Sequence, residues 1–179
     1  MDFSILIAYI IKELNNNNIG FGKTKLLKLA YLIELDFYRK NRKRLTDKQW
    51  VYYKFGPYVF DFDKELDTKA LFTIDDLSDE FTKVTLNDWV DLPEIDSEIS
   101  RLITRDVREY GDWGLNHLLD LIYFNTEPMM KALERFDVLD FSVSDPSKKF
   151  KIKELKINQE EHKTLIAELR EKIKNAKPI

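Results

Sequence analysis

The pattern with the clearest chemical meaning is Gly22-Lys23-Thr24, which matches the end of a phosphate-binding loop. A full loop has another glycine five positions before Gly22, and this chain has Asn17 there. The residues before the pattern have helical apolar spacing, whereas a phosphate-binding loop follows a strand. The sequence therefore predicts a turn in which Thr24 is the N-cap of a helix, and it predicts no nucleotide cofactor.

Residues that could bind a metal or act as nucleophiles are few. His117 and Asp120 lie three residues apart on a predicted helix, but two ligands fall short of the three or four of a zinc site. The chain has no cysteine, which removes thiolate nucleophiles and cysteine metal sites, and no serine stands in a Gly-x-Ser-x-Gly segment. We therefore expect a protein that is not an enzyme, with no catalytic, metal or cofactor-binding residues.

Charge is placed unevenly along a chain whose net charge is −3. Residues 22 to 54 hold ten basic side chains and three acidic ones, a balance of +7. Residues 61 to 98 hold thirteen acidic side chains and three basic ones, a balance of −10. Two such fields either steer a charged partner or attract each other within the fold.

The elements that must position these residues are mainly helical. Apolar residues at three- and four-residue spacing predict helices over residues 2 to 15, 24 to 39, 95 to 110, 115 to 123 and 162 to 173, with a short one over 129 to 136. Residues 24 to 39 are apolar nearly all round, which is typical of a helix at the centre of a fold.

Aromatic and β-branched residues predict short strands. Residues 50 to 55 read as a strand closed by Gly56-Pro57, with Pro57 in the first turn of a helix that runs to about Thr68. Residues 70 to 74 and 81 to 86 read as a hairpin around an acidic turn, 75 to 80. The prediction is an α+β, mainly α-helical fold: a compact helical domain around a central apolar helix, with a small antiparallel β-sheet and a C-terminal helix.

The polar stretch 142 to 149 divides the chain into a domain at 1 to 141 and a C-terminal extension at 142 to 179, an extended arm followed by an amphipathic helix. The apolar run at residues 3 to 11 is shorter than the roughly 20 residues that cross a bilayer. With no cysteine and no such run, we expect a cytoplasmic protein without a membrane partner.

Two segments resemble the Panacea, or SocA-like, antitoxin domain family, and the resemblance covers residues 3 to 135. The first joins a lysine-leucine helix, a Leu-Thr loop, an aromatic strand and a Gly-Pro pair; its matching residues are Lys25, Leu26, Lys28, Leu29, Tyr31, Leu45, Thr46, Trp50, Tyr53, Gly56 and Pro57. The second joins a Tyr-Gly turn to a helix and a Glu-Pro element; its matching residues are Tyr110, Gly111, Leu115, Leu118, Leu119 and 123 to 132. Tyr123 and Met129 depart from the family, which usually has His and Trp there.

The resemblance implies an antitoxin that binds and neutralises a cognate toxin protein. It also implies a second partner for some members, a ClpXP-type protease to which the toxin is delivered. Neither role requires a catalytic residue. The alternative is a DNA- or RNA-binding regulatory protein that uses the basic loop 39 to 44 with nearby aromatic side chains. The pI of 5.6 and the lack of a helix-turn-helix pattern make this alternative the less favoured of the two.

Three sets of residues are candidates for partner binding: the Gly-Pro turn and its neighbours, the acidic turn, and the last helix. They are Tyr53, Phe55, Gly56, Pro57 and Tyr58; Asp75, Asp76, Asp79 and Glu80; and Leu165, Leu169 and Ile173. The turn either defines the fold or forms a partner-facing rim. The acidic residues either attract a basic partner or form a solvated face, and the last helix either contacts the partner or packs on its own domain.

Overall fold

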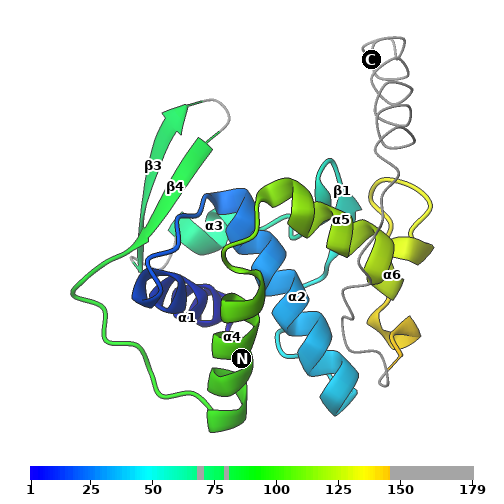
Figure 1. The fold of residues 1–179 in the computed structure, drawn as a ribbon, viewed down its shortest axis with the longest axis horizontal. Coiled ribbons are helices and arrows are strands. Elements are labelled where there is room, and N and C mark those ends of the chain that lie inside the picture. Colours follow the sequence, from blue (N-terminus) through cyan, green and yellow to red (C-terminus); the bar gives the residue numbers. More distant parts are fainter. Residues whose placement is uncertain (68–70, 79–80, 146–179) are drawn as a thin grey trace. The chain divides into compact units, whose positions relative to one another are not determined.

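A computed structural model describes residues 1–67, 71–78 and 81–145 (Figure 1). The helices of these residues are α1 (Phe3–Asn16), α2 (Lys23–Asn41), α3 (Phe62–Asp67), α4 (Ser97–Tyr110), α5 (Leu115–Asn125), α6 (Glu127–Lys131) and the 3-10 turn η1 (Phe141–Val143). The strands are β1 (Val51–Tyr53), β2 (Gly56–Tyr58), β3 (Phe72–Ser78) and β4 (Phe81–Leu86). The predicted α+β, mainly helical class is confirmed, and the small sheet is two separate antiparallel pairs, β1–β2 and β3–β4.

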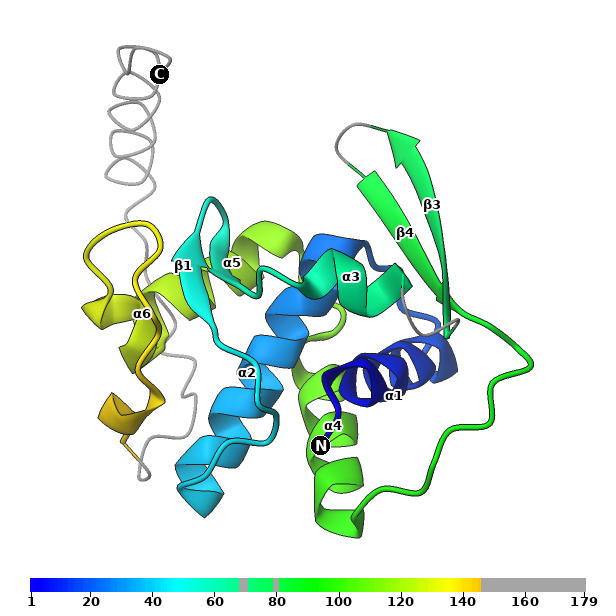
Figure 2. The same cartoon turned by 180° about the vertical axis from the view of Figure 1, so that it is seen from behind.

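Helix α2 lies at the centre because nearly every face of it is apolar. Leu26, Tyr31 and Leu32 are fully buried, although they point in different directions from the helix axis. In Figures 1 and 2, α2 passes between α1 and α4 on one side and α5 with the β1–β2 hairpin on the other. The prediction of a central apolar helix is thus correct.

Helices α1 and α4 pack closely beside α2, and polar residues set where each begins. Asp2 accepts a hydrogen bond from the Ser4 N–H (2.9 Å), and Asp96 accepts one from the Glu98 N–H (2.7 Å), so each helix has a side-chain N-cap. A Cβ on Gly111, just after α4, would clash with the Val107 carbonyl oxygen and would lie 3.1–3.2 Å from the side chains of Ile19 and Leu14. The close approach at this end of α4 therefore requires glycine.

The start of α2 differs from the prediction. The helix begins at Lys23 after Gly22, which makes no side-chain cap, so Thr24 is inside the first turn and is not the N-cap. The segment before it is helix α1, as expected, and not the strand that precedes a phosphate-binding loop.

The strand β1 forms a tight hairpin with β2, and this corrects the predicted role of Pro57. Val51 pairs with Tyr58 and Tyr53 with Gly56, so Pro57 lies in a strand and the helix that follows starts only at Phe62. Gly56 has a φ of +80°, a conformation that favours glycine. The Gly-Pro pair therefore closes a hairpin and does not open a helix.

The strands β3 and β4 form the predicted hairpin with different limits. Asp75 lies opposite Lys83 and Asp76 opposite Thr82, so both acidic residues belong to β3 and not to the turn. Residues 79 and 80 of the predicted acidic turn lie outside the described residues. In Figure 1 the hairpin projects away from the helices.

The first unit of the chain spans Met1–Ser147. Phe141 of η1 is buried in it, with its ring centre 5.7 Å from that of Tyr31 on α2. The predicted arm and amphipathic helix, with Leu165, Leu169 and Ile173, lie outside the described residues, and the boundary at residue 142 stays a prediction.

The central position of α2 makes a core truncation costly. Leu29→Ala should lower the free energy of unfolding by about 2–5 kcal/mol, because it leaves a cavity among fully buried side chains. Urea unfolding measures this. Leu133→Ala is the matched control, since that leucine is 88% exposed and its change should stay within about 0.5 kcal/mol. Equal stability of wild type and Leu29→Ala would contradict the central placement.

The hairpin turn makes a second prediction. Gly56→Ala should cost about 1–2 kcal/mol, because a side chain at φ +80° meets its own backbone even though the surrounding space admits a methyl group. Gly20→Ala should be close to neutral, since Gly20 has no neighbouring atom within 4 Å of the added Cβ. Thermal unfolding of the two variants compares them, and an unperturbed Gly56→Ala would refute the strained turn.

Candidate partner-binding site

The rings of Tyr53, Tyr58, Phe60 and Phe136 form a cluster, and together with Phe55 of the same hairpin we call these residues the aromatic platform. Neighbouring ring centres of four of these residues lie 5.4–6.1 Å apart, with Tyr53 contacting all of the other three. Phe55, at the tip of the hairpin, is 62% exposed, and Phe60 and Phe136 are 56% and 59% exposed. Exposed aromatic groups of this kind are typical of protein interaction sites.

Backbone contacts bring Phe136 to a hairpin more than seventy residues away in the sequence. The Phe136 N–H donates to the Tyr52 carbonyl (2.7 Å), and the Tyr52 N–H donates to the Asp137 carbonyl (2.9 Å). The segment after α6 thus runs beside β1, which Figures 1 and 2 both show. Phe136 has a φ of +78°, uncommon for a bulky residue, and such conformations concentrate at functional surfaces.

The Gly-Pro pair lies beneath the platform. Gly56 and Pro57 are buried, whereas Tyr53, Phe55 and Tyr58 reach the surface. Behind Gly56 stands Tyr123 of α5, which contacts the Gly56 backbone and the Tyr52 ring. Burial raises the pKa of Tyr123 to about 12. Of these five predicted residues, Tyr53, Phe55 and Tyr58 reach the surface, and Gly56 and Pro57 are buried in strand β2.

A cavity of about 150 Å³ opens between this hairpin and the start of α2. Lys28 lines it, and its Nζ donates to the Pro57 carbonyl (2.7 Å) while the side chain is only 2% exposed. Burial lowers the pKa of Lys28 to about 7. A buried ammonium is thus held at the platform by a carbonyl and not by a carboxylate.

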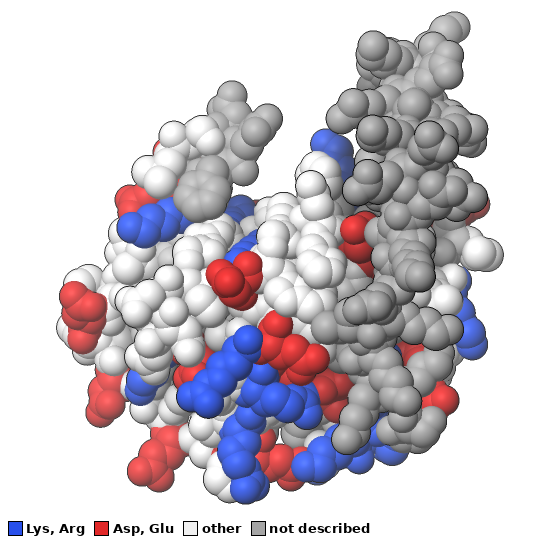
Figure 3. Space-filling view, viewed as in Figure 1, with Lys and Arg blue, Asp and Glu red and all other residues white. Residues whose placement is uncertain are grey.

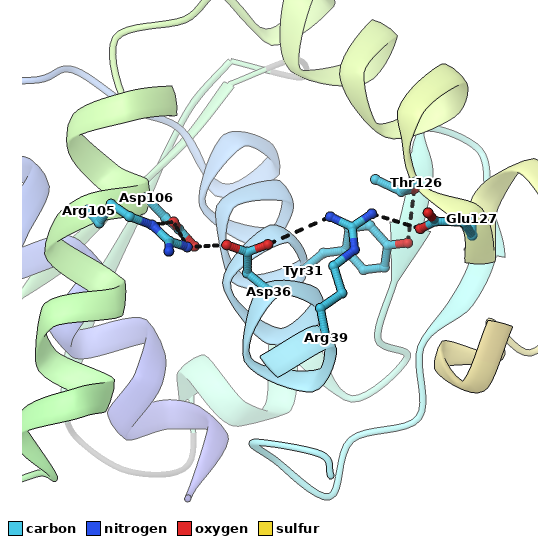
Figure 4. Close-up of polar contacts among 7 residues, drawn as sticks. All are labelled: Tyr31, Asp36, Arg39, Arg105, Asp106, Thr126 and Glu127. Atoms are coloured by element: carbon cyan, nitrogen blue, oxygen red, sulfur yellow. Dashed lines mark hydrogen bonds and ion pairs between the residues drawn. The ribbon is translucent and has the colours of Figure 1, made fainter. Parts of the chain in front are cut away.

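Two segments of the sequence motifs meet in a buried polar contact (Figure 4). The Thr126 hydroxyl donates to the Ile122 carbonyl (2.6 Å), so its single hydrogen is used and Tyr31 Oη must donate to Thr126 Oγ1 (3.2 Å). One residue further on, Glu127 accepts a bond from Arg39 Nη2 (2.7 Å). These contacts fix the start of α6 on α2.

The same network continues to α4 (Figure 4). Asp36 lies between two guanidinium groups, with Arg39 at 3.6 Å and Arg105 hydrogen-bonded on the other side. Arg105 also donates to the neighbouring Asp106, which is 1% exposed. Burial and the Asp36 carboxylate raise the pKa of Asp106 to about 7, although the Arg105 guanidinium favours the ionised form. Helices α4, α2 and α6 are therefore joined by alternating charges.

Glu34, near the middle of α2, is fully buried and acts as a hydrogen-bond acceptor for the chain that leads to β1. Trp50 Nε1 donates to it (3.0 Å), as do Thr46 Oγ1 (2.8 Å) and Arg44 Nε (2.7 Å). A buried carboxylate needs such donors, since an ionised group without them is costly. The Leu-Thr loop and the aromatic strand of the first motif are thus fixed by one carboxylate.

The basic loop makes mostly internal contacts. Arg39 and Arg44 bind the acidic groups above, Arg42 donates to the Ser144 carbonyl (2.8 Å), and Lys40 pairs with Glu98 (2.7 Å). Of the aromatic side chains near it, Trp50 is fully buried. Elsewhere on the face in Figure 3, basic and acidic side chains lie next to each other over α4. Most basic side chains of the loop 39 to 44 therefore already contact groups of this protein. The nucleic-acid alternative stays a prediction.

The acidic candidates are placed only in part. Asp75 and Asp76 are exposed on β3, and Asp76 accepts a hydrogen bond from Thr82 Oγ1 (2.7 Å). Asp79 and Glu80, like Leu165, Leu169 and Ile173, lie outside the described residues. The two described acidic candidates, Asp75 and Asp76, therefore lie on a hairpin separate from the β1–β2 hairpin of the platform.

Some residues of the site are not evident from the sequence alone. Phe60 and Phe136 are not among the predicted candidates, and Phe136 reaches the hairpin only through tertiary contacts that no local pattern encodes. The buried charges do leave a signal, because Lys28, Glu34 and Arg39 interrupt an otherwise apolar helix. In such a helix a charged residue must find a partner from another segment.

Within residues 1–67, 71–78 and 81–145, no group of three or more His, Asp or Glu residues is arranged to hold a metal ion. No helix of these residues has the length and apolar character needed to cross a membrane. Comparisons with protein-family models, curated proteins and solved structures give no match to this chain. The resemblance to Panacea domains therefore remains a prediction from the motif residues.

The buried ammonium makes stability depend on pH in a defined direction. The folded pKa of Lys28 is about 7 and the unfolded value 10.5, so between these values the unfolded chain binds one proton more than the folded chain. Stability of the wild type should rise with pH in this window, relative to Lys28→Met, by at most about 1.4 kcal/mol per pH unit.

Urea unfolding of both proteins across that window checks the slope. Lys43→Met is the matched control, since Lys43 is an exposed lysine of the basic loop and its loss should leave the slope unchanged. If the free energy of unfolding changed with pH equally in the wild type and in Lys28→Met, the lowered pKa of a buried Lys28 would be contradicted.

Proposed function

We propose that this chain is a Panacea-like antitoxin that binds and neutralises a toxin protein, using the aromatic platform as the centre of the contact. The observation that carries the proposal is the platform itself: five aromatic side chains on one surface, three of them more than half exposed. Aromatic residues dominate the binding energy of protein interfaces, because they bury large apolar areas at little conformational cost.

The arrangement of the motif residues supports this role. Trp50, Gly56 and Thr126 are buried. The two motif segments meet through two contacts, one between Tyr31 and Thr126 and one between Arg39 and Glu127. Such residues hold the scaffold and leave the exposed rings as the part that can vary with the partner. A protein that binds by a surface needs this division and no catalytic group.

The cognate toxin is the first partner in this proposal. A ClpXP-type protease, to which the bound toxin would be delivered, is the second. Delivery needs a surface separate from the platform, because the toxin would occupy the platform. The β3–β4 hairpin, which extends from the helices, is such a surface (Figure 2).

Removing the platform should abolish toxin binding without unfolding the protein. We expect Phe60→Asp combined with Phe136→Asp to lose both capture of the neighbouring gene's product and rescue of growth. Asp tolerates the positive φ of residue 136 better than Phe does, so the thermal midpoint should be retained. Co-expression tests the rescue of growth, pull-down tests the capture of the toxin, and thermal unfolding tests whether the fold is retained.

Trp89→Asp is the matched control, since Trp89 is an aromatic residue that is 77% exposed outside the platform. It should bind the toxin as the wild type does. Full binding by the doubly substituted platform, or equal loss in Trp89→Asp, would refute the platform as the interface.

The acidic strand β3 makes a separate kinetic prediction. Asp75→Lys combined with Asp76→Lys should slow association with a basic toxin at low ionic strength and leave dissociation nearly unchanged, because exposed charges steer encounter more than they hold the complex. The effect should shrink at physiological salt, where the Debye length is about 8 Å. Stopped-flow measurement of the association rate constant tests this prediction. A change below about twofold at low salt would show that the acidic residues are a solvated face and do not steer the toxin.

A further inference from the structure

The cavity beside the platform has the size of a site for one side chain. Its volume of about 150 Å³ is below the roughly 300–1,000 Å³ of small-molecule sites. Leu27 of α2, Tyr53 and Tyr58 of the hairpin and Phe62 of α3 form apolar and aromatic walls. A nucleotide or other large cofactor would not fit, whereas a side chain inserted from a bound protein would.

The buried polar group of this cavity is Lys28, whose ammonium form has no counter-charge among the described residues. An ammonium has three N–H donors, and the contact of Lys28 is the single bond to the Pro57 carbonyl. No carboxylate of the described residues lies within ion-pair distance of Lys28, and Asp63, which follows the lining residue Phe62, pairs with Lys23. A buried charge of this kind gains from an anionic partner.

The surroundings of Lys28 also favour a negative ligand. The first turn of the 19-residue α2 lines the cavity at Lys23 and Thr24, and no side chain caps it. Uncapped N–H groups and the helix dipole attract negative charge. Lys54, on the hairpin loop, adds a third basic residue to the lining.

We propose that this cavity receives an acidic side chain of the toxin, whose carboxylate pairs with Lys28 and whose methylene groups pack between Tyr53, Tyr58 and Leu27. This inference rests on the proposed function, because the acidic side chain would anchor the partner that covers the platform. An apolar side chain would fill the same walls but leave the ammonium without compensation, so a carboxylate on a short apolar stem fits better.

The carboxylate site is tested without the toxin by titrating the full chain with butyrate while the Lys28 ammonium is followed by nitrogen NMR. A carboxylate within ion-pair distance should raise the pKa of Lys28 by about 1–3 pH units at saturation. The other titratable and charged groups around the cavity are Lys23, Lys54, Tyr53, Tyr58 and Asp63, and their signals separate general charge effects from binding. Butyramide, which has the same shape without the charge, should give no such rise.

An unchanged Lys28 pKa in butyrate, or an equal response to butyramide, would overturn the proposal. This measurement uses the wild type, so it remains decisive even if Lys28→Met fails to fold.

A second measurement separates this inference from the proposed function. With a toxin in hand, Lys28→Met should weaken its affinity by about tenfold or more, because a buried charge pair is lost. Lys54→Met, a change at the rim of the same cavity, should have a smaller effect. Undiminished toxin affinity in a folded Lys28→Met would overturn the anchoring role and leave the antitoxin proposal intact. A butyrate response without any toxin binding would support the carboxylate site, but it would overturn the antitoxin proposal and, with it, the toxin as the source of the carboxylate.

Discussion

The structure depends on one constraint: helix α2 is buried on all sides and still carries charged residues. Each of these charges must be matched by a group from another segment, because an uncompensated buried charge is costly. The partners are Arg44, Thr46 and Trp50 for Glu34, Arg105 for Asp36 and Glu127 for Arg39, while Lys28 has a hydrogen bond to the Pro57 carbonyl and no counter-charge. These partners belong to the hairpin and the loop before it, α4 and α6, so the charges of one helix determine how the rest is arranged around it.

This arrangement separates the residues that hold the fold from those that face outward. Buried groups of α2 hold the hairpin from behind, and its turn requires a glycine at residue 56. The hairpin then presents Tyr53 and Phe55 to the surface, where the segment after α6 adds Phe136. A rigid base under exposed rings reduces the conformational entropy lost on binding. The scaffold is thus suited to a binding surface whose outer residues can change while the buried network stays the same.

Long periodic segments could be predicted from the sequence, and tertiary contacts could not. The helices α1, α2, α4 and α5 follow from apolar spacing over nine or more residues. The preference of proline for the first turn of a helix predicts a helical Pro57, but pairing with Tyr52 and the hydrogen bond from Lys28 place it in a strand. The platform joins residues 53 to 60 to residue 136 through backbone contacts that no local pattern encodes.

Hydrogen–deuterium exchange of the full chain, with and without the co-expressed toxin, tests most directly whether the platform is the contact surface. We predict that the toxin slows exchange in peptides covering residues 51 to 60 and 133 to 139, because these two segments form the platform. The basic loop 39 to 44 should exchange at the same rate in both states. Slower exchange confined to that loop or to α4, with the hairpin unchanged, would contradict the account.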